Sequence, residues 1–209
     1  MHTLYGYKGS GSAAVEIALA MASIPYELIE AASWVPESAN DALKAHNPLG
    51  QIPTLLLPDG TVLTESAAIL MHLGLTYPES KLLPSSPSQR ARVLRGLVYI
   101  AANCYAAIGV IDFPERWNAL PDEVVNERVK AGATARLHEY WSLFADQFDA
   151  NPYLGGEQPN ALDILAVVVS KWSGARKHLR EARPAFFETL LLIERHPAVV
   201  PVMQRYWPQ

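Results

Sequence analysis

The stretch NPLGQIP at residues 47–53, followed after a short gap by Glu65-Ser66, decides the fold expected of this chain. The stretch predicts a turn that leads into a strand at Pro53. A proline donates no hydrogen bond to a sheet, and the peptide bond before it is the only kind that is readily cis. A cis Ile52-Pro53 bond would leave the Ile52 N–H and C=O outside the sheet, free to hold an extended, peptide-like ligand.

Glu65 and Ser66 place an acid and a hydroxyl at the start of an apolar helix predicted over residues 66–77. Free N–H groups and the positive end of the helix dipole favour a carboxylate there. A site for a peptide bond beside a site for a free carboxylate suits a small anionic peptide, which points to glutathione. Either motif alone is ordinary turn or capping chemistry. Their order and spacing, with a hairpin predicted from 54–57 and 61–63 between them, make the pair specific.

Composition limits the class of protein. A length of 209 residues allows one large domain or two small ones with a substantial core. The chain is 50% hydrophobic and 18% charged, which is typical of a compact globular protein rather than a disordered one. A net charge of −4 disfavours nucleic acid and anionic membranes as partners.

Two further features favour the cytoplasm. Cys104 is the only cysteine, which excludes an internal disulfide and a CxxC redox or zinc site and fits a reducing compartment. The apolar run 164–169 is too short to span a bilayer, and Glu16 interrupts the apolar stretch near the N-terminus, so no signal peptide is expected. We therefore expect a cytoplasmic protein without a membrane partner.

The first half of the chain has alternating strand and helix patterns. Residues 3–7 and 26–30 predict strands, and residues 13–23 between them predict a helix with a wide apolar face. A short helix is expected within 34–45, before the hairpin and the helix at 66–77. The order βαβ and then ββα is that of a thioredoxin-like domain.

A segment rich in proline and serine, residues 81–88, predicts a linker between two domains. The expected domains are thus residues 1–80, thioredoxin-like, and residues 89–209, all-helical. Asn160 and Asp163 predict a capping box that opens a nearly all-apolar helix at the centre of the second domain.

Helical spacing of apolar residues predicts the remaining elements. Long helices are expected over 89–108, with Val98 and Tyr105 among the apolar positions, and over 121–150. Shorter helices near 185–195 and 198–206 close the chain.

Taken together, these motifs resemble those of the cytosolic glutathione transferases, over nearly the whole chain. The resemblance is carried by the turn after the first strand, NPLGQIPTL at 47–55, ESAAIL at 65–70 with Tyr77-Pro78 after it, the proline linker and the capping box. It implies an α/β N-terminal thioredoxin-like domain plus an all-α C-terminal helical domain. It also implies glutathione as co-substrate. The Ile52 backbone would hold the cysteinyl part, Gln51 would reach the glycyl end, and Glu65 and Ser66 would bind the γ-glutamyl group.

Conjugation requires the thiolate of glutathione. A free thiol has a pKa of about 8.5. A hydroxyl donor at the start of the first helix, helped by the helix dipole, can stabilise the anion. Ser10 is the predicted catalytic residue, because it follows the first strand and precedes the helix. Alignment on the strand puts Ser10 on the catalytic serine of the family, whereas alignment on the helix puts Gly9 there. Ser12, expected to cap the helix, and Tyr5, expected to pack against the sheet, are the alternatives.

The second substrate is expected to lie against the helical domain. The residues predicted to line that pocket are Tyr99, Asn103, Phe113 and Trp117. Cys104 is expected to be a buried structural residue. No metal is expected, because the spacing of His46, His72 and His178 is not that of metal ligands.

The hypothesis from the sequence is a glutathione transferase that joins the glutathione thiolate to a small electrophile, as a homodimer like most of its family. Arg90, Arg92 and Arg95 are expected on a solvated face or at the dimer interface. Another glutathione-dependent enzyme (a peroxidase, an isomerase or a dehalogenase) and a non-catalytic binding module are the alternatives. The polar signature of maleylacetoacetate isomerases is incomplete, because Gly9 and Gly11 replace two of its three residues.

Overall fold

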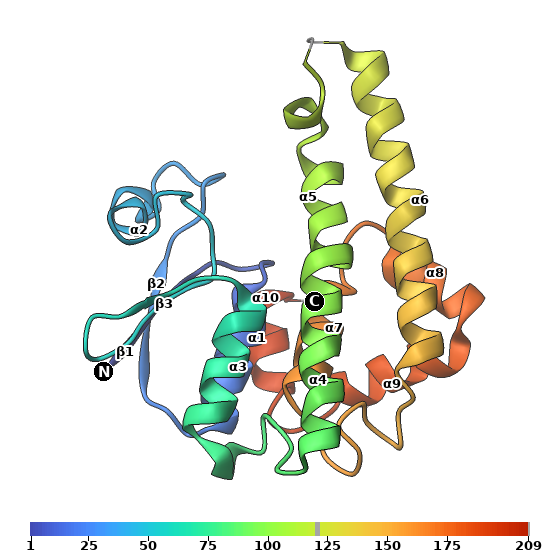
Figure 1. Cartoon of the computed structure of the whole chain (residues 1–209). Helices are drawn as coiled ribbons and strands as arrows, with labels where there is room; N and C mark the ends of the chain where they lie inside the picture. The colour runs from blue at the N-terminus through green and yellow to red at the C-terminus, as the bar shows by residue number, and fades with distance from the viewer. Residues whose placement is uncertain (120–121, 209) are drawn as a thin grey trace.

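The computed structural model describes residues 1–119 and 122–208, and it places a small sheet with flanking helices beside a bundle of helices (Figure 1). The sheet has the strand order β2-β1-β3-β4. Its strands are β1 (His2–Gly6), β2 (Tyr26–Glu30), β3 (Thr54–Leu56) and β4 (Val62–Leu63). β2 runs parallel to β1, β3 antiparallel to β1, and β4 antiparallel to β3. This arrangement confirms the predicted order of βαβ and then ββα.

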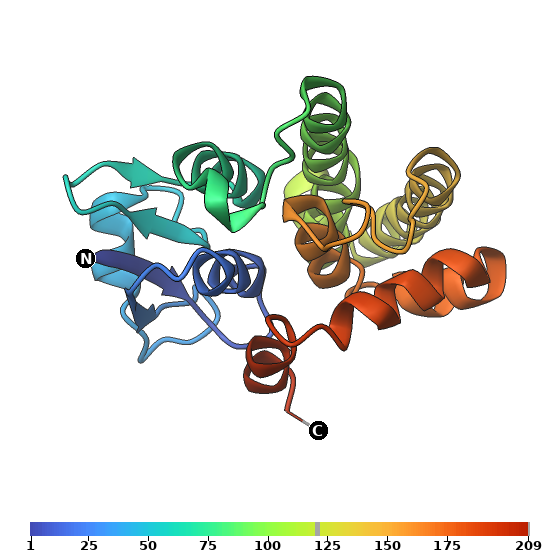
Figure 2. The same cartoon turned by 90° about the horizontal axis from the view of Figure 1, so that it is seen from below.

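Helices cover both faces of the sheet because successive strand residues point to opposite sides. Leu4 of β1 belongs to the large core with α1 (Ser12–Met21) and α3 (Ser66–Thr76). Its neighbour Tyr5 instead packs with Leu43 of α2 (Asn40–His46) on the other face. Figure 2 shows α1 and α3 between the sheet and the helical half of the molecule.

The second half of the chain is helical, as predicted. Its elements are η1 (Pro78–Ser80), α4 (Pro87–Tyr99), η2 (Ile100–Tyr105), α5 (Ala106–Asp112), η3 (Pro114–Trp117), α6 (Glu123–Gln147), α7 (Ala161–Val169), α8 (Ala175–Ala182), α9 (Pro184–Glu194) and α10 (Val200–Tyr206). The helix α8 had no counterpart in the sequence prediction. α4 begins inside the expected linker, so the bounds 1–80, 81–88 and 89–209 stay a prediction.

The helix predicted over 89–108 is one continuous helix in which the six residues of η2 form a π-helical segment. By length and composition alone this helix, Pro87–Asp112, could cross a membrane. In the fold it packs against α6 and α7, as the core helix of a globular protein does. Val98, expected on its apolar face, is 54% exposed, because the buried face of α4 runs through Val93, Gly96 and Leu97 instead.

The long helix predicted over 121–150 is α6, which is shorter at both ends. Residue 121 lies outside the described residues. Asp122 caps α6 by accepting hydrogen bonds from the N–H groups of Val124 (2.9 Å) and Val125 (3.1 Å).

The helix α7 lies at the centre of the molecule, since all nine of its residues are buried and it packs against α1 and α3 as well as α4 and α9. Its capping box is confirmed. The Asn160 side chain accepts from the Leu162 N–H (2.8 Å), and Asp163 accepts from the Asn160 N–H (3.0 Å). The Asp163 carboxylate also accepts from the N–H groups of Leu154 (2.8 Å) and Gly155 (2.9 Å). One buried side chain thus fixes both the start of α7 and the loop before it.

The last helix returns to the first strand and its turn (Figure 2). The Gly9 N–H donates to the Tyr206 carbonyl oxygen (3.1 Å), and the Ser12 and Tyr206 hydroxyls are hydrogen-bonded (3.1 Å). Arg205 forms an ion pair with Glu16, a residue of α1 that is only 2% exposed. The turn before α1 therefore depends on contacts from both ends of the chain.

Candidate functional site

A cavity of about 1160 Å³ opens between the two halves of the molecule. Its first wall comes from the turn 9–11, the segment 47–53 and the start of α3 at 64–67. Its second wall comes from the helical half, chiefly η2, α5 and η3, with Trp172 at the inner end. Ligand cavities for drug-sized molecules span roughly 300–1,000 Å³, so this cavity has room for a tripeptide and a second small molecule.

The segment 47–53 forms the first wall through its main chain. The Asn47 side-chain amide donates to the Gln51 carbonyl oxygen (3.0 Å) and to the Thr54 hydroxyl (3.1 Å). The Thr54 hydroxyl donates to the same carbonyl (2.9 Å). The Ile52-Pro53 bond is cis, as predicted. Within residues 1–119 and 122–208, the Ile52 N–H and C=O have no hydrogen-bond partner, so both are open to the cavity.

The start of α3 supplies the second part of this wall. Its N-cap residue, Glu65, makes no side-chain capping bond, and Thr64, Glu65 and Ser66 all line the cavity. Glu65 also has a φ of 63°, which is uncommon for a residue other than glycine. The free N–H groups of the first turn therefore remain available to an anion. The structure thus brings together the four predicted glutathione-binding residues, with Gln51 and Ile52 beside Glu65 and Ser66.

Ser10, the predicted catalytic residue, lines the cavity but is only 6% exposed. Its hydroxyl donates to the Tyr7 carbonyl oxygen (2.6 Å) and lies 2.6 Å from the Ser12 hydroxyl. A hydroxyl has one proton, and in this geometry the proton of Ser10 serves the turn. A catalytic role for Ser10 stays a prediction, and it requires this hydroxyl to rotate toward the ligand.

The two alternatives to Ser10 have other positions. Ser12 was expected to cap α1, but it is the first residue of the helix, and its hydroxyl accepts from the Tyr7 N–H (3.1 Å). The N-cap residue is Gly11, which has no side chain to cap with, and it lines the cavity; the Ser12 N–H that follows donates to the Ser10 hydroxyl (3.3 Å). Tyr5 packs with Leu43 away from the cavity, as expected, with its ring 5.7 Å from that of His46.

Tyr105 and Trp172 also line the cavity, and neither was predicted as a site residue. The Tyr105 hydroxyl lies at Gly11, where a backbone hydrogen bond from Gly11 reaches its oxygen. The rings of Tyr105 and Trp172 lie 5.8 Å apart. One signal was available: Ala101, Tyr105 and Ile108 follow helical spacing, and all three line the cavity.

The outer end of the cavity contains two of the four residues predicted for the second-substrate pocket. Phe113 and Trp117 line it, and the Arg116 guanidinium lies 3.9 Å from the centre of the Phe113 ring. Tyr99 and Asn103 do not line it, which corrects that part of the prediction. The Tyr99 hydroxyl donates to the Tyr140 carbonyl oxygen (3.0 Å), and its ring packs on Phe144 in the helical core.

The helix geometry explains this correction. Asn103 and Tyr99 lie on the side of the helix that faces α6, where the Asn103 amide donates back to the Tyr99 carbonyl oxygen (3.0 Å). Asn103 borders a separate, smaller hollow of about 280 Å³ together with Tyr140. The cavity face of the helix is that of Tyr105 and Ile108.

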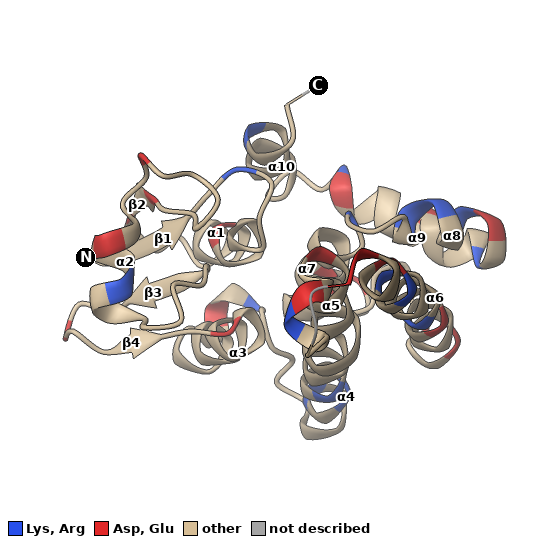
Figure 3. Cartoon of the chain, turned by 90° about the horizontal axis from the view of Figure 1, so that it is seen from above, with Lys and Arg blue, Asp and Glu red and all other residues tan. Residues whose placement is uncertain are grey.

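Charges around the cavity balance. Its lining holds two acids, Glu65 and Asp112, and two bases, Arg116 and Lys130. Burial raises the pKa of Asp112, although the charge of Lys130 opposes this. Over the rest of the molecule, charges of both signs are interspersed along α6 and α8 (Figure 3). The cavity therefore lacks the excess of positive charge that would bind a substrate with two carboxylates.

The remaining predicted residues lie away from this chemistry. Cys104 is fully buried, and burial raises the pKa of its thiol, as a structural role requires. Arg92 and Arg95 both lie over the Phe148 ring, and Arg92 donates to the Asp149 carbonyl oxygen (2.9 Å). In the part of the chain that the structure describes, no three His, Cys, Asp or Glu side chains gather to hold a metal ion.

Comparison with known proteins agrees with this geometry. The family described as "Glutathione S-transferase, N-terminal domain" matches residues 12–76. The "Uncharacterized GST-like protein YncG" of Escherichia coli K12 is 32% identical over 173 residues, which are 82% of this chain and 82% of the relative. A "Probable maleylacetoacetate isomerase" of Caenorhabditis elegans is 42% identical over 89 residues, 42% of this chain and 41% of the relative.

Solved structures extend the match to the whole fold. A glutathione transferase homologue from Sulfitobacter, solved with bound glutathione, superimposes with a TM-score of 0.86 at 25% identity over 98% of both chains. The thioredoxin-like N-terminal domain and the helical C-terminal domain are thereby confirmed. The chain belongs to the glutathione S-transferase family.

Proposed function

We propose that this protein is a glutathione transferase, which binds glutathione along the first wall of the cavity and joins its thiolate to a small electrophile held against α5 and η3. One observation carries this proposal: the open main chain at Ile52 lies beside the uncapped start of α3, in a single cavity. Ile52 would hold the cysteinyl part of glutathione and Gln51 the glycyl end. Glu65 and Ser66 would bind the γ-glutamyl group.

The lining of the second wall supports an aromatic or other apolar electrophile. Ile108, Ile111 and Leu165 provide apolar surface, and Phe113 and Trp117 add aromatic rings. An electrophile that is flat and largely uncharged would bury these surfaces and leave the charges at the rim in water.

An isomerase is the second candidate. The similarity to a probable maleylacetoacetate isomerase, over 89 residues of this chain, favours this candidate. The balanced charge of the cavity argues against it, because an isomerase of this kind must hold a substrate with carboxylates at both ends. Gly9 and Gly11 argue in the same direction, since they leave the turn without two of the polar side chains of that branch.

Calorimetry with glutathione tests the binding part of the proposal. We expect saturable binding by the wild-type protein, with competition from S-hexyl glutathione, whose alkyl chain would lie on the second wall. Absence of binding at millimolar glutathione would contradict the proposal. Turnover of an activated aryl chloride compared with isomerisation of a maleyl diacid then separates the two candidates, and we expect the first to be faster.

We further propose a cytoplasmic homodimer. Leu75 of α3 and Val98 of α4 are 63% and 54% exposed on two helices that pack side by side, and a second copy could cover them. Light scattering should give twice the mass of one chain. Replacing both residues with glutamate should give monomers, and an unchanged mass would place the interface elsewhere.

A further inference from the structure

Tyr105 reaches from the helical half of the molecule to the head of α1. A methyl group placed on Gly11 would collide with the Tyr105 hydroxyl and would lie 3.2 and 3.3 Å from two carbons of its ring. Gly11 has an ordinary helical φ of −66°, so its conformation does not demand glycine. The reason for glycine here is space: the missing side chain lets the phenol approach the backbone.

The position that this phenol occupies is one that attracts an anion. Gly11 is the N-cap of α1, where the positive end of the helix dipole lies. The N–H groups that follow already have partners, since the Ser12 N–H donates to the Ser10 hydroxyl (3.3 Å) and the Ala13 N–H to the Ser10 carbonyl oxygen (3.3 Å). The Tyr105 oxygen receives the backbone hydrogen bond of Gly11. A thiolate bound next to the phenol would be stabilised by the same helix dipole and could accept a hydrogen bond from the phenol.

The serine hydroxyls of the turn are less available. Ser10 bonds to Tyr7 and Ser12, and Ser12 bonds to Tyr206, all within the protein. Tyr105 has no such acceptor among the described residues, so its proton is free for a ligand. Burial raises the pKa of Tyr105 to about 12, with the charges of Asp112 and Glu65 adding to the effect. The phenol therefore keeps its proton at neutral pH and acts as a donor.

Tyr105 is placed by its helix and by the packing of its ring. It is the last residue of the π-helical segment η2, and such segments often occur at functional sites. Its ring packs on Trp172, which packs in turn on Trp207 at 6.2 Å.

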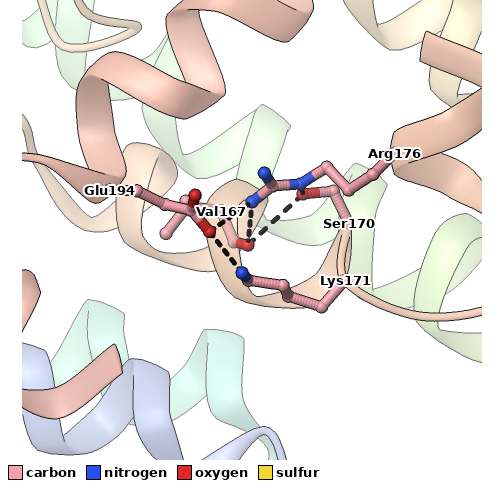
Figure 4. Close-up of polar contacts among 5 residues, drawn as sticks. All are labelled: Val167, Ser170, Lys171, Arg176 and Glu194. Atoms are coloured by element: carbon pink, nitrogen blue, oxygen red, sulfur yellow. Dashed lines mark hydrogen bonds and ion pairs between the residues drawn. The ribbon is translucent and has the colours of Figure 1, made fainter. Parts of the chain in front are cut away.

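The residue before Trp172, Lys171, belongs to a polar cluster shown in Figure 4. Glu194 of α9 pairs with Lys171 (2.5 Å) and with Arg176 (3.1 Å). Arg176 also donates to the Ser170 hydroxyl (2.7 Å) and to the Val167 carbonyl oxygen (2.9 Å). These contacts tie the end of α7, α8 and α9 together around the turn that carries Trp172.

We propose that the Tyr105 hydroxyl, which accepts the hydrogen bond of the Gly11 N–H, donates a hydrogen bond with its own proton to the glutathione sulfur and is the catalytic residue that stabilises the thiolate. This inference rests on the proposed function. The thiol proton passes to solvent when the thiolate forms, and Tyr105 keeps its own proton. Ser10 then acts on the shape of the turn, through Tyr7 and Ser12.

The variant Tyr105→Phe tests this role, with the ultraviolet absorbance of the thiolate followed against pH in the glutathione complex. We expect the pKa of the bound thiol to rise by about one unit, and kcat/KM for an activated aryl chloride to fall about tenfold at neutral pH. Glutathione affinity at low pH, where the thiol is protonated, should change less than about threefold. Tyr99→Phe is the matched control, since it removes a hydroxyl from the same helix outside the cavity, and it should leave the thiol pKa unchanged.

A second variant distinguishes the loss of this hydrogen bond from a structural effect of Tyr105→Phe. Gly11→Ala should push the phenol away and raise the thiol pKa in the same direction. The double variant should show no larger rise than Tyr105→Phe alone, because both changes remove one interaction.

The outcomes separate the two proposals. If the wild-type protein binds glutathione and Tyr105→Phe leaves the thiol pKa unchanged, the role of Tyr105 is wrong and the proposed function stands. A rise caused by Ser10→Ala in place of Tyr105→Phe would assign the role to Ser10. If the wild-type protein does not bind glutathione, the proposed function itself fails.

Discussion

The starts of α7 and α1 differ in a way that separates stability from binding. α7 begins with its own cap: Asn160 and Asp163 satisfy the first N–H groups, and the whole helix is buried. α1 and α3 begin at Gly11 and Glu65, neither of which makes a side-chain capping bond, and both starts line the cavity. One helix end is closed within the protein, and the other two face the cavity.

This difference shows where the chain keeps its unsatisfied backbone groups. An uncapped helix start costs about 1 kcal/mol relative to one with a good cap. At α7 an uncapped start would destabilise a helix that packs against both halves of the molecule. At α1 and α3 a bound anion can offset the same cost. Changes at the α7 cap should therefore affect stability, and changes at the α3 start should affect glutathione binding.

The largest expected effect is at Asp163. In Asp163→Ala the N–H groups of Leu154, Gly155 and Asn160 lose their acceptor in a buried setting, at about 1–3 kcal/mol each. We expect the free energy of unfolding to fall by about 3 kcal/mol or more in urea denaturation. Asp122→Ala, at the exposed cap of α6, is the control and should cost only about 1 kcal/mol. Equal losses would show that the α7 cap has no special importance.

The second effect is at the α3 start. Glu65→Gln removes the charge proposed to pair with the γ-glutamyl amine, and we expect glutathione to bind about tenfold more weakly by calorimetry. The free energy of unfolding should change by less than about 0.5 kcal/mol, because Glu65 is exposed and does not cap its helix. Glu79→Gln, another exposed acid, should leave both quantities unchanged. A loss of stability without a loss of affinity would show that Glu65 supports the fold and does not bind glutathione.

The smallest effect concerns acid stability far from the cavity. The rings of His138 on α6 and His178 on α8 are stacked at 4.6 Å. Burial lowers the pKa of His178 below its usual 6.5, and the charges of His138 and Arg183 lower it further, against an opposing effect of Glu181.

The sign of the pH dependence follows from this lowered pKa. Below about pH 6.5 the unfolded chain binds a proton at this position that the folded protein resists. Stability is therefore lost as the pH falls from 6.5 toward the folded-state pKa of His178. His178→Gln should flatten this loss in thermal melts, with His72→Gln as the control. Glutathione affinity should stay the same in both variants, and any change would connect this histidine pair to the cavity.

Local chemistry made much of the fold predictable. β2 has the bounds 26–30 that the alternating pattern predicts. The cis bond at Pro53 and the capping box at Asn160 follow from the preferences of single residues and were both predicted. α8 escaped prediction because only two of its eight residues, Ala175 and Leu179, are buried, which leaves little apolar pattern to detect.

The candidate site was predictable on one side only. The side proposed to bind glutathione is built from contiguous segments that line the cavity, so Gln51 and Glu65 could be found from local motifs. The other side depends on how two halves of the chain pack. Tyr105 looks like any core residue of an apolar helix until Gly11 is placed opposite it. Tyr99 carries the same side chain six residues earlier and faces the helical core instead.

The contacts of Tyr206 have a consequence for how the protein matures during synthesis. The hydrogen bond between Ser12 and Tyr206 joins positions 194 residues apart. The turn before α1 is therefore synthesised early, whereas its partner in α10 is among the last residues to leave the ribosome. A nascent chain that has already formed every strand still lacks the groups that hold Gly9 and Ser12. A chain that ends before Arg205 should therefore form the sheet but lack the contacts of Tyr206 that hold the turn before α1.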